Sequence, residues 1–495
     1  MSDADLINHD LAPTPAEART WGTMHIAALW IGMAVCIPTW TMASGLVDKG
    51  WTWQVAVASI ALGNLVVLVP MVLNAHAGTR YGIPFPVLVR SSFGVVGANV
   101  PALLRALVAC GWFGINTYIG GAAMAQVVRV VVLSSSTPSG RLPILGIEPV
   151  ELICFVAFWA LQLFILLRGM ESLKRLESWA APFLILIVIA LLVWAIDRSG
   201  SFAKMLENPP STSTASTTNE RGYGALLGAG LTSAVSFWGT LALNIPDFSR
   251  YAKSQKSQAL GQLIGLPLTM AFMAFVGAVV TNASFAIFGE RVSDPVVLLG
   301  KVGGTTTTVL AMLALLFATL TTNVAANIVG PANDFSNLSP ARISFRAGCV
   351  ITAVIGLLIM PWRLYNDAGN YLFTWLLGYG AMLGGVAGVM IADYWLLRRQ
   401  HLDLDDLYTG AGRYRFVRGT NPVAIVALVA GVAVNLPGFL GALGVVDVGE
   451  PWKTIYDWAW FVAFFVSAAL HVAGMKLFPG LAPDLRDASS STTPT

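Results

Sequence analysis

The chain has 495 residues, of which 56% are hydrophobic and only 11% are charged, and its mean hydropathy is +0.70. Soluble proteins carry about 25% charged residues, so this chain has less than half of the charge that a water-facing surface needs. The composition excludes a soluble enzyme, a secreted disulfide scaffold and a nucleic-acid-binding protein, and the net charge of +3 is too small to indicate a polyanionic partner. It predicts a multi-pass membrane protein embedded in the lipid bilayer.

The four cysteines indicate neither a disulfide framework nor a zinc site. They lie inside apolar segments and lack Cys-x-x-Cys spacing: Cys36, Cys110, Cys154 and Cys349. The first twenty residues are polar and acidic, whereas a secretory signal has basic residues followed by a short apolar core. We therefore expect no cleavable signal peptide.

The apolar runs of the sequence predict the membrane spans. A hydrocarbon core of about 30 Å is crossed by a helix of about 20 residues, and twelve runs are suitable. They lie at 24–47, 54–75, 101–133, 149–168, 179–197, 223–245, 258–288, 305–330, 343–361, 370–397, 422–441 and 456–477. Twelve spans place both termini on the same side of the membrane.

The distribution of basic residues predicts which side that is. With the N-terminus in the cytoplasm, 18 Lys and Arg residues fall in inner segments and ten fall in outer loops. Cytoplasmic loops carry the excess of basic residues in membrane proteins. We therefore expect both termini in the cytoplasm and the protein in the plasma (inner) membrane.

A segment rich in Ser, Thr and Pro between the fifth and sixth spans predicts a flexible external linker. It divides the first ten spans into two sets of five. The expected units are a cytoplasmic N-terminal tail (1–23), a first five-helix repeat (24–197), the external linker (198–222), a second five-helix repeat (223–397), a cytoplasmic loop (398–421), two C-terminal helices (422–477) and a cytoplasmic tail (478–495).

The first helix of each set is interrupted. The first span contains WIGMAVCIPTWTMASG, with Gly32 and Pro38, and the sixth contains SFWGTLALNIPDFSR, with Gly239, Asn244 and Pro246. Proline frees backbone groups, which in hydrocarbon need protein, water or a ligand as partners. Either interruption alone is equally compatible with an ordinary proline kink. At matching positions they indicate an inverted repeat with a binding site at the breaks, as in secondary transporters.

The eighth span carries polar side chains that suit such a site. It reads ATLTTNVAANIVGPAND, in which Thr321 and Thr322 are adjacent and Asn327 follows. Threonine hydroxyls also bond to their own helix, so the pair is not diagnostic alone. Together with unwound carbonyl groups of the first helix, the hydroxyls predict oxygen-only coordination of a monovalent cation, without a carboxylate. Asn327 lies well over a turn further on and suits a different ligand.

The third and sixth spans place aromatic and amide groups near mid-membrane. Trp112 and Asn116, in ACGWFGINTYIGGAAM, are four residues apart and share a helix face. An indole offers a flat apolar wall, and a carboxamide offers both a donor and an acceptor. With Trp238 they predict a slot for a flat, polar, uncharged heterocycle. The alternative is that the tryptophans fill the core or belong to an interfacial belt.

Four sequence blocks resemble the nucleobase–cation symporter-1 family, which contains transporters for hydantoins, allantoin, uracil and purines. In order they are ALWIGMAVCIPTW, YGIPFPVLVRSSFG followed by ACGWFGINTYIGG, FWGTLALNIPDFSR, and TLTTNVAANIVGPANDFSNL. The resemblance covers nearly the whole chain. It implies an all-α five-plus-five inverted repeat of the leucine-transporter type with two extra C-terminal helices, and alternating access between an outward and an inward cavity.

The resemblance also implies the residues of the site. For the substrate they are the stacking Trp112, its amide partner Asn116, the second aromatic Trp238 and the eighth-span Asn327. For sodium they are the carbonyl groups of Gly32, Val35 and Ala318 and the hydroxyl groups of Thr321 and Thr322.

Three positions depart from the family pattern and leave the identity of the ligand open. Cys36 stands where relatives tend to have an amide facing the substrate, Asn116 is one methylene shorter than the glutamine of many relatives, and Phe237 occupies a position that is small in some of them. We include Cys36 and Phe237 in the expected substrate site. Uracil, allantoin, hydantoin and purines all remain candidates.

Two other functions compete with sodium-coupled symport. Proton-coupled symport of the same substrates is the main alternative, because some relatives use protons, although the threonine pair favours sodium. A membrane-embedded enzyme is a remote alternative, because the five histidines are scattered without metal-ligand spacing. We therefore expect no cofactor beyond the coupling ion.

Charged residues near the spans are expected to have structural roles or to form a gate. Asp247 and Arg250 follow the break in the sixth span and form either an internal gate or a helix end. Arg105 is expected to snorkel or to pair at the cytoplasmic face. Asp334 and Asp393 are expected to stabilise loops at span ends.

Overall fold

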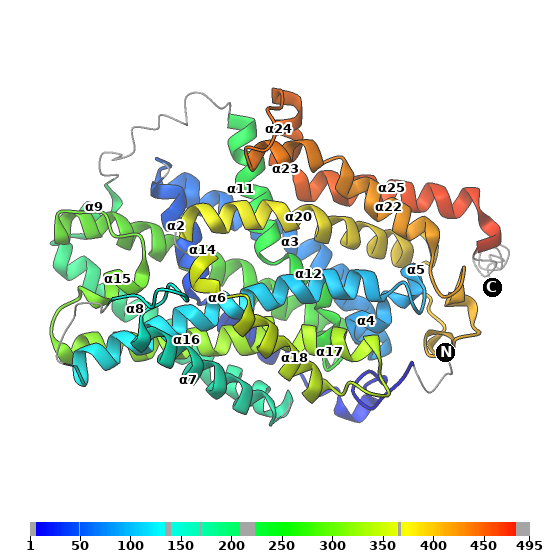
Figure 1. Ribbon diagram of the computed structural model, residues 1–495, viewed down its shortest axis with the longest axis horizontal. Helices are drawn as coiled ribbons and strands as arrows, with labels where there is room; N and C mark the ends of the chain where they lie inside the picture. Colours follow the sequence, from blue (N-terminus) through cyan, green and yellow to red (C-terminus); the bar gives the residue numbers. More distant parts are fainter. Residues whose placement is uncertain are drawn as a thin grey trace.

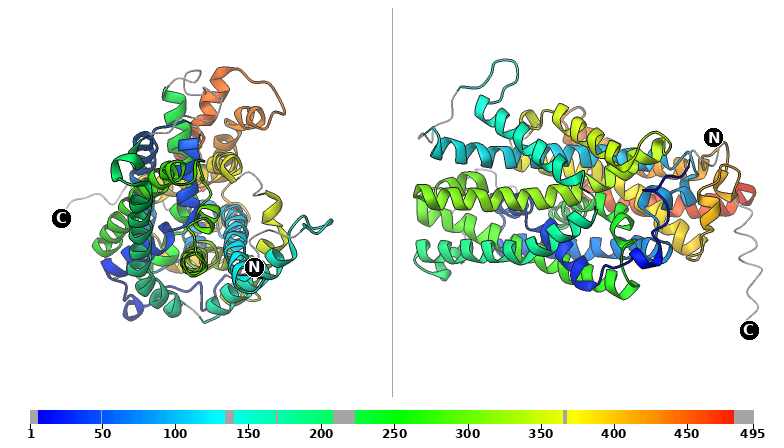
Figure 2. Two further views of the ribbon diagram at one scale, coloured as in Figure 1. Left: turned by 90° about the vertical axis from the view of Figure 1, so that its left-hand side faces the viewer. Right: turned by 90° about the horizontal axis from the view of Figure 1, so that it is seen from below.

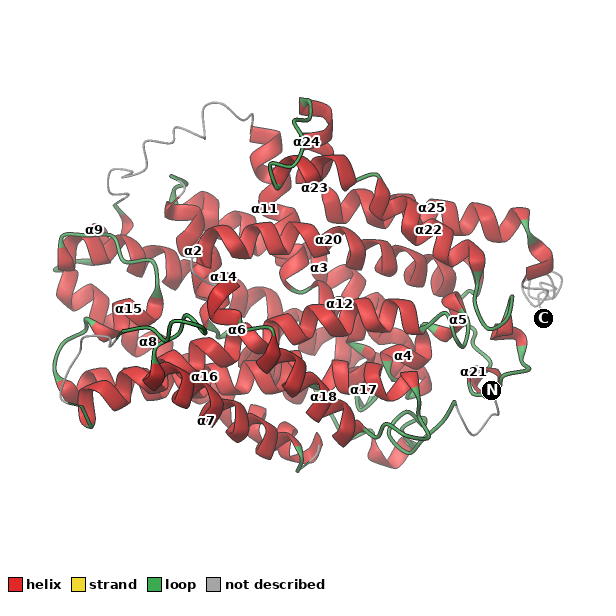
Figure 3. Cartoon of the chain, viewed as in Figure 1, coloured by secondary structure: helices red, strands yellow, loops and turns green. Residues whose placement is uncertain are grey.

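The protein has the all-helical architecture that its composition predicts. The structure is a computed structural model and describes residues 6–48, 50–133, 140–168, 170–207, 223–364 and 368–481. Within these ranges the regular structure is helical apart from two isolated β-bridges (Figure 3). The long helices run along the long axis of the molecule (Figures 1 and 2).

The first set of spans contains one helix pair and four long helices, joined by short elements. After η2 (Ala16–Ala18), its elements are α1 (Thr23–Ala34), α2 (Ile37–Asp48), α3 (Trp53–Tyr81), α4 (Phe85–Leu88), α5 (Arg90–Phe93), α6 (Asn99–Val131), α7 (Pro149–Leu166) and α8 (Met170–Ser199). The expected linker 198–222 begins with a short helix, α9 (Phe202–Leu206), and its part from residue 208 onward lies outside the described residues.

The second set and the C-terminal helices follow. The second set comprises α11 (Tyr223–Phe237), α12 (Gly239–Asn244), α13 (Pro246–Ser249), α14 (Gln255–Phe288), α15 (Pro295–Gly300), α16 (Thr305–Asn327), α17 (Val329–Leu338), α18 (Phe345–Leu358), α19 (Pro361–Leu364), α20 (Ala368–Ile391) and the π-helical η3 (Ala392–Leu397). The remaining elements are α21 (Leu404–Leu407), η4 (Arg413–Arg415), α22 (Pro422–Ala433), α23 (Leu436–Ala442), α24 (Glu450–Asp457), α25 (Ala459–Leu477) and η5 (Pro479–Leu481).

Most of the predicted spans are continuous helices. Among the described residues, nine helices are long and apolar enough to cross a membrane, and the bent pairs α1–α2 and α22–α23 bring the number to eleven. The predicted sixth span, 223–245, corresponds to α11 and α12. Its apolar helix Leu227–Phe237 is short for a span by itself, because the helix is interrupted at Trp238.

The interruption of the first span lies just before the proline. α1 ends at Ala34 and α2 begins at Ile37, with a bend of 55° between them. Pro38 is the second residue of α2, where a missing amide proton costs no helical hydrogen bond. The break is therefore formed by Val35 and Cys36, and Pro38 helps to begin the second half-helix.

The sixth span is broken in a comparable way. Trp238, with φ −97° and ψ 9°, separates α11 from α12, and Pro246 is the first residue of α13. α12 is buried along its whole length. Both predicted interruptions are thus confirmed as breaks, and in both the proline stands at the start of the following helix.

The packing of the two sets is reciprocal. α1 packs on α14, the second span of the other set, and α11 packs on α3, which is the second span of the first set. The central helices α6 and α16 pack on each other, while α7 packs on α6 and α18 packs on α17. This exchange of partners is what two inverted copies of one five-helix unit produce. α22 and α25 pack on each other and on α20.

The described chain begins and ends at the same end of the molecule (Figure 1). The N-terminal segment is fastened there: the Asn8 side chain donates to Ser336 Oγ at 2.8 Å, and Arg19 donates to the Thr79 carbonyl at 3.1 Å. Termini at one end are what an even number of spans predicts. Which compartment this end faces stays a prediction from the basic residues.

A buried ion pair joins the last helix of the second set to the C-terminal helices. Asp393 in η3 accepts hydrogen bonds from Arg398 Nε at 2.7 Å and lies 3.2 Å from Nε2 of His471 in α25. Arg398 also donates to the Ser91 carbonyl at 2.8 Å. Asp393, Arg398 and His471 are all buried, so Asp393 has the structural role that was expected for it.

We expect Asp393→Ala to lower the free energy of unfolding by about 3–5 kcal/mol, because it leaves the Arg398 guanidinium buried without its counter-ion. Denaturant-induced unfolding in detergent measures this loss. The control is Asp405→Ala, which removes an exposed carboxylate from α21. Equal stability of the two variants would show that the ion pair contributes nothing.

Candidate functional site

The two helix breaks border a common cavity in the centre of the bundle. The six side chains expected to contact a substrate all line it: Cys36, Trp112, Asn116, Phe237, Trp238 and Asn327. Thr322, from the predicted cation site, lines the same cavity. The structure therefore brings together residues from α6, α16 and both breaks. That they bind a substrate stays a prediction.

The cavity is contracted. Its volume is about 20 Å³, and one water molecule needs about 10–15 Å³. A heterocyclic ligand is several times larger than water, so it fits only after lining side chains move. Phe237 is the most exposed of the six at 9%, and its ring meets the edge of Trp112 at 5.4 Å between centroids. Rotation of Phe237 is the simplest way to enlarge the space.

The aromatic wall is held in place by ring contacts and one hydrogen-bond chain. Trp238 packs edge-on against Trp30 at 5.2 Å and against Phe237 at 4.9 Å. The Trp112 indole Nε1 donates to the Tyr379 hydroxyl at 3.1 Å, which in turn donates to the Ser236 carbonyl at 2.9 Å. Tyr379 of α20 thus fixes the plane of Trp112.

Two buried polar atoms on the cavity lining have no hydrogen-bond partner within the described residues. They are the carbonyl oxygen Oδ1 of Asn116 and the indole nitrogen Nε1 of Trp238. The Asn116 amide nitrogen is already used, because it donates to the Trp112 carbonyl at 3.1 Å. Buried polar groups are nearly always paired. The cavity therefore offers one unused acceptor and one unused donor.

Asn327 belongs to an amide network that crosses three helices. Its Nδ2 donates to Asn323 Oδ1 at 2.8 Å, and Asn323 Nδ2 donates to Gln162 Oε1 at 2.7 Å and to the Phe113 carbonyl at 3.1 Å. These contacts tie α16 to α6 and α7. They orient the Asn327 amide toward the cavity that it lines.

The threonine pair meets the first break. Thr322 Oγ1 lies within hydrogen-bond distance of the Gly32 carbonyl at 3.0 Å, and Thr321 Oγ1 of the Ala318 carbonyl at 3.0 Å and the Gly32 carbonyl at 3.4 Å. Val35, whose carbonyl group is the fifth predicted ligand, lies in the break and is buried. Four of the five predicted cation ligands are thus connected by hydrogen bonds. Sodium binding there stays a prediction.

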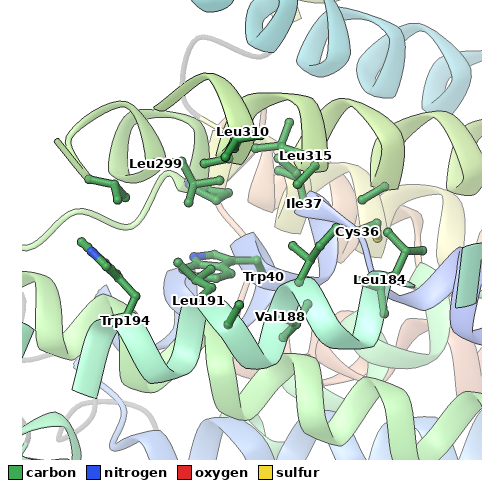
Figure 4. Close-up of a pocket in the computed structure, with 18 of the residues that line it drawn as sticks. Cys36, Ile37, Trp40, Leu184, Val188, Leu191, Trp194, Leu299, Leu310 and Leu315 are labelled. Carbon is green, nitrogen blue, oxygen red and sulfur yellow. The ribbon is translucent and has the colours of Figure 1, made fainter. Parts of the chain in front are cut away.

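A larger, apolar cavity adjoins this region. It has a volume of about 310 Å³ and lies between α2, α8 and α16 (Figure 4). Its lining includes Val35, Cys36 and Ala318, together with Trp40 and Leu184. The predicted cation site therefore borders a mostly apolar cavity.

Four charged residues near the site form contacts with other groups in the interior. Arg105 and Asp334 form a fully buried ion pair at 2.9 Å. Asp247 accepts hydrogen bonds from the Phe85 amide at 3.0 Å and from Asn244 at 3.1 Å, whereas Arg250 donates to the Asp10 carbonyl at 2.8 Å. Asp247 thus bonds to the first amide of α4, and the choice between a gate and a helix-end role stays a prediction. Arg105 pairs in the core and does not snorkel, because α17 presents Asp334 to it.

Sequence reasoning missed three polar residues at or near the site. Tyr379 and Gln162 were assigned to plain apolar spans, although each is a polar group inside such a span, which is a signal in itself. Glu177 was placed outside the fifth span, predicted at 179–197. The structure begins α8 at Met170, which puts Glu177 two turns inside the helix with 1% of its surface exposed.

The chain is similar to known proteins in both sequence and structure. The sequence pattern of a family described as permeases for cytosine/purines, uracil, thiamine and allantoin matches residues 13–463. A purine–uracil permease of Arabidopsis thaliana is 44% identical over 95% of this chain and 78% of the relative. An allantoin permease of Bacillus subtilis is 40% identical over 96% of this chain and 94% of the relative.

The fold is also found in a solved structure. A nucleobase-cation-symport-1 family transporter, in a closed conformation with bromovinylhydantoin bound, superposes with a TM-score of 0.77 at 25% identity. The match covers 97% of each chain. The predicted five-plus-five fold of the leucine-transporter type is thereby confirmed.

We expect Tyr379→Phe to destabilise the protein by about 1–3 kcal/mol, because the buried Trp112 indole loses its acceptor and the Ser236 carbonyl loses its donor. The measurement is unfolding in detergent, made in a double-mutant cycle with Trp112→Phe. The cost of Tyr379→Phe should shrink in the Trp112→Phe background. Strict additivity would mean that the hydrogen bond carries no energy.

Proposed function

This chain belongs to the family of permeases for cytosine/purines, uracil, thiamine and allantoin, and we propose that it imports a flat heterocycle of this class by sodium-coupled symport. The family contains membrane transporters of small molecules, so the chain is a transporter and not an enzyme. Its substrate is of the nucleobase or allantoin type. The proposal adds the direction of transport, the residues of the site and the ion.

The substrate assignment rests on the unpaired donor and the unpaired acceptor on the cavity lining. Uracil, allantoin, hydantoin and oxopurines such as hypoxanthine each present adjacent N–H and C=O groups on a flat ring. Asn116 Oδ1 suits the ring N–H and Trp238 Nε1 suits the carbonyl. Trp112 supplies a flat wall for stacking, and Asn327 supplies a second amide. The contracted cavity fits a transporter that closes around its substrate and opens to either side in turn.

The contact between α16 and the first break supports coupling to a cation. Thr321, Thr322 and the carbonyl groups of Gly32, Val35 and Ala318 would provide five oxygen ligands, which suit a hard monovalent ion. Because Thr322 lines the substrate cavity as well, ion and substrate share a wall. Binding of one therefore favours the arrangement that binds the other.

The proposal also assigns a position and a role to the remaining parts of the chain. The two five-helix units, 24–197 and 223–397, move relative to each other around the site, and the helices of 422–477 pack on α20 outside it. The basic residues place the tails 1–23 and 478–495 and the loop 398–421 in the cytoplasm, with the linker 198–222 outside. The plasma (inner) membrane is the proposed location.

We expect Trp112→Ala and Asn327→Ala each to weaken substrate affinity tenfold or more, because stacking and an amide hydrogen bond are each worth about 1–3 kcal/mol in a dry site. The measurement is uptake of labelled uracil, allantoin, hydantoin and hypoxanthine by cells, with membrane expression checked. Trp112→Phe should retain most of the affinity. The control Trp179→Ala removes a tryptophan that is 81% exposed on α8. Wild-type affinity in both site variants would refute the site.

We expect Thr322→Ala to abolish the sodium enhancement of substrate binding while leaving binding without sodium nearly unchanged. Linkage is reciprocal, so substrate should also cease to tighten sodium binding. The control is Thr319→Ala, whose buried hydroxyl donates only locally, to the Leu315 carbonyl at 2.9 Å. Substrate affinity and sodium affinity of the two variants are measured on purified protein, and choline replaces sodium in the sodium-free condition.

A wild-type protein that ignores sodium while a pH gradient drives uptake would contradict sodium coupling. Proton coupling would then replace it, with the substrate site unchanged. Sodium enhancement that survives Thr322→Ala would instead place the ion elsewhere in the protein.

A further inference from the structure

Glu177 is a buried carboxyl group inside a membrane-spanning helix that none of the preceding roles uses. It lies in the candidate span Glu171–Ser199, with 1% of its surface exposed. Ionisable residues at such positions are costly and are usually functional. Its surroundings therefore require an explanation.

Glu177 lacks the partners that the other buried carboxylates have. Asp334 pairs with Arg105, and Asp393 pairs with Arg398. Neither Oε1 nor Oε2 of Glu177 has a hydrogen-bond partner within the described part of the chain. A buried carboxylate without a counter-charge is strongly disfavoured, so a positive charge, supplied by a proton or by a bound cation, must neutralise it.

The carboxyl group lies beside residues of the predicted cation site. It fills the space beside the Gly32 backbone: the carboxyl carbon would lie 2.9 Å from a Cβ at that position, so a side chain there would have to displace the end of the Glu177 side chain. The Gly32 carbonyl is the group that Thr321 and Thr322 approach from α16. α1, α8 and α16 pack on one another in pairs. Gly32, three residues before the break at Val35, is therefore approached by a carboxyl group from α8 and by two hydroxyls from α16.

We propose that the Glu177 carboxylate is the charged group of the coupling-cation site. This deepens the proposed function, because it rests on a monovalent cation binding at the first break. Sequence reasoning predicted a site of neutral oxygens, without a carboxylate. Glu177 adds a full negative charge from α8, a helix that contributed no ligand to that prediction.

The charge gives the cation a defined effect on the fold. Without the cation, the carboxylate opposes the close approach of α8 to α1, because both would enclose an unpaired charge. With the cation bound, the pair is neutral and the helices close around it. The flank of α8 two turns further on is apolar at Leu184 and Val188 (Figure 4) and supplies no competing charge. Cation occupancy therefore determines whether α1 and α8 pack tightly.

Direct binding of ²²Na⁺ to the purified full-length protein tests this without knowledge of the substrate. We expect Glu177→Gln, which keeps the size and removes the charge, to raise the half-saturating sodium concentration at least tenfold. Glu177→Asp keeps the charge but withdraws it by one methylene, so it should fall between the two. The matched control is Glu171→Gln, an equal loss of charge on the same helix at a side chain that is 62% exposed and pairs with Arg175. It should bind sodium as the wild type does.

Other results separate this proposal from the proposed function. Wild-type sodium affinity in Glu177→Gln would overturn the role of Glu177 and leave sodium coupling intact. If the wild type binds no ²²Na⁺, sodium coupling falls, and uptake driven by a pH gradient then tests Glu177: its loss in Glu177→Gln retains the residue as the cation carboxylate with a proton as the ion, and its persistence overturns the proposal. If Glu177→Gln does not fold, wild-type sodium affinity in Glu177→Asp overturns it.

Discussion

The backbone of the first helix is interrupted where the structure offers it polar partners, and this constraint organises the rest of the protein. In hydrocarbon an unpaired carbonyl has no water to bond, so a broken helix persists only beside protein groups, a ligand or an ion. At the first break, Thr321 and Thr322 provide such groups to Gly32. The position of α16 is therefore coupled to the break in α1.

Reciprocal packing of the two five-helix units places these groups opposite each other. Because α1 packs on the second unit and α11 packs on the first, each break lies against helices of the other unit. Trp112 and Asn116 of α6 then face Trp238 at the second break across one cavity. The Arg105–Asp334 pair further along α6 joins the same two units through a buried charge contact. A relative movement of the units would change both the cavity and the predicted cation site together.

Close backbone approach at the break requires the smallest residue. Gly32 is contacted by the carboxyl group of Glu177 on α8, and the carbonyl group of the same residue receives the hydroxyls of α16. A side chain at this position would have to displace the Glu177 carboxyl group. The glycine thus lets a side-chain end of α8 lie against the same residue whose carbonyl group receives the hydroxyls of α16.

The sequence alone was enough to predict the membrane class, the positions of most spans and both breaks, because these depend on local composition and on proline and glycine at fixed positions. The residues it named for the substrate line one cavity, and their roles stay predictions. Only the tertiary structure showed that Pro38 follows the break, that Tyr379 bonds to Trp112, and that Glu177 reaches Gly32. These contacts join helices far apart in the chain, and no local pattern encodes which faces meet. Glu177 was missed because the helix extends beyond its apolar run: hydropathy marks the part of α8 that contacts lipid, whereas packing against α1 buries a charged turn that hydropathy assigns to water.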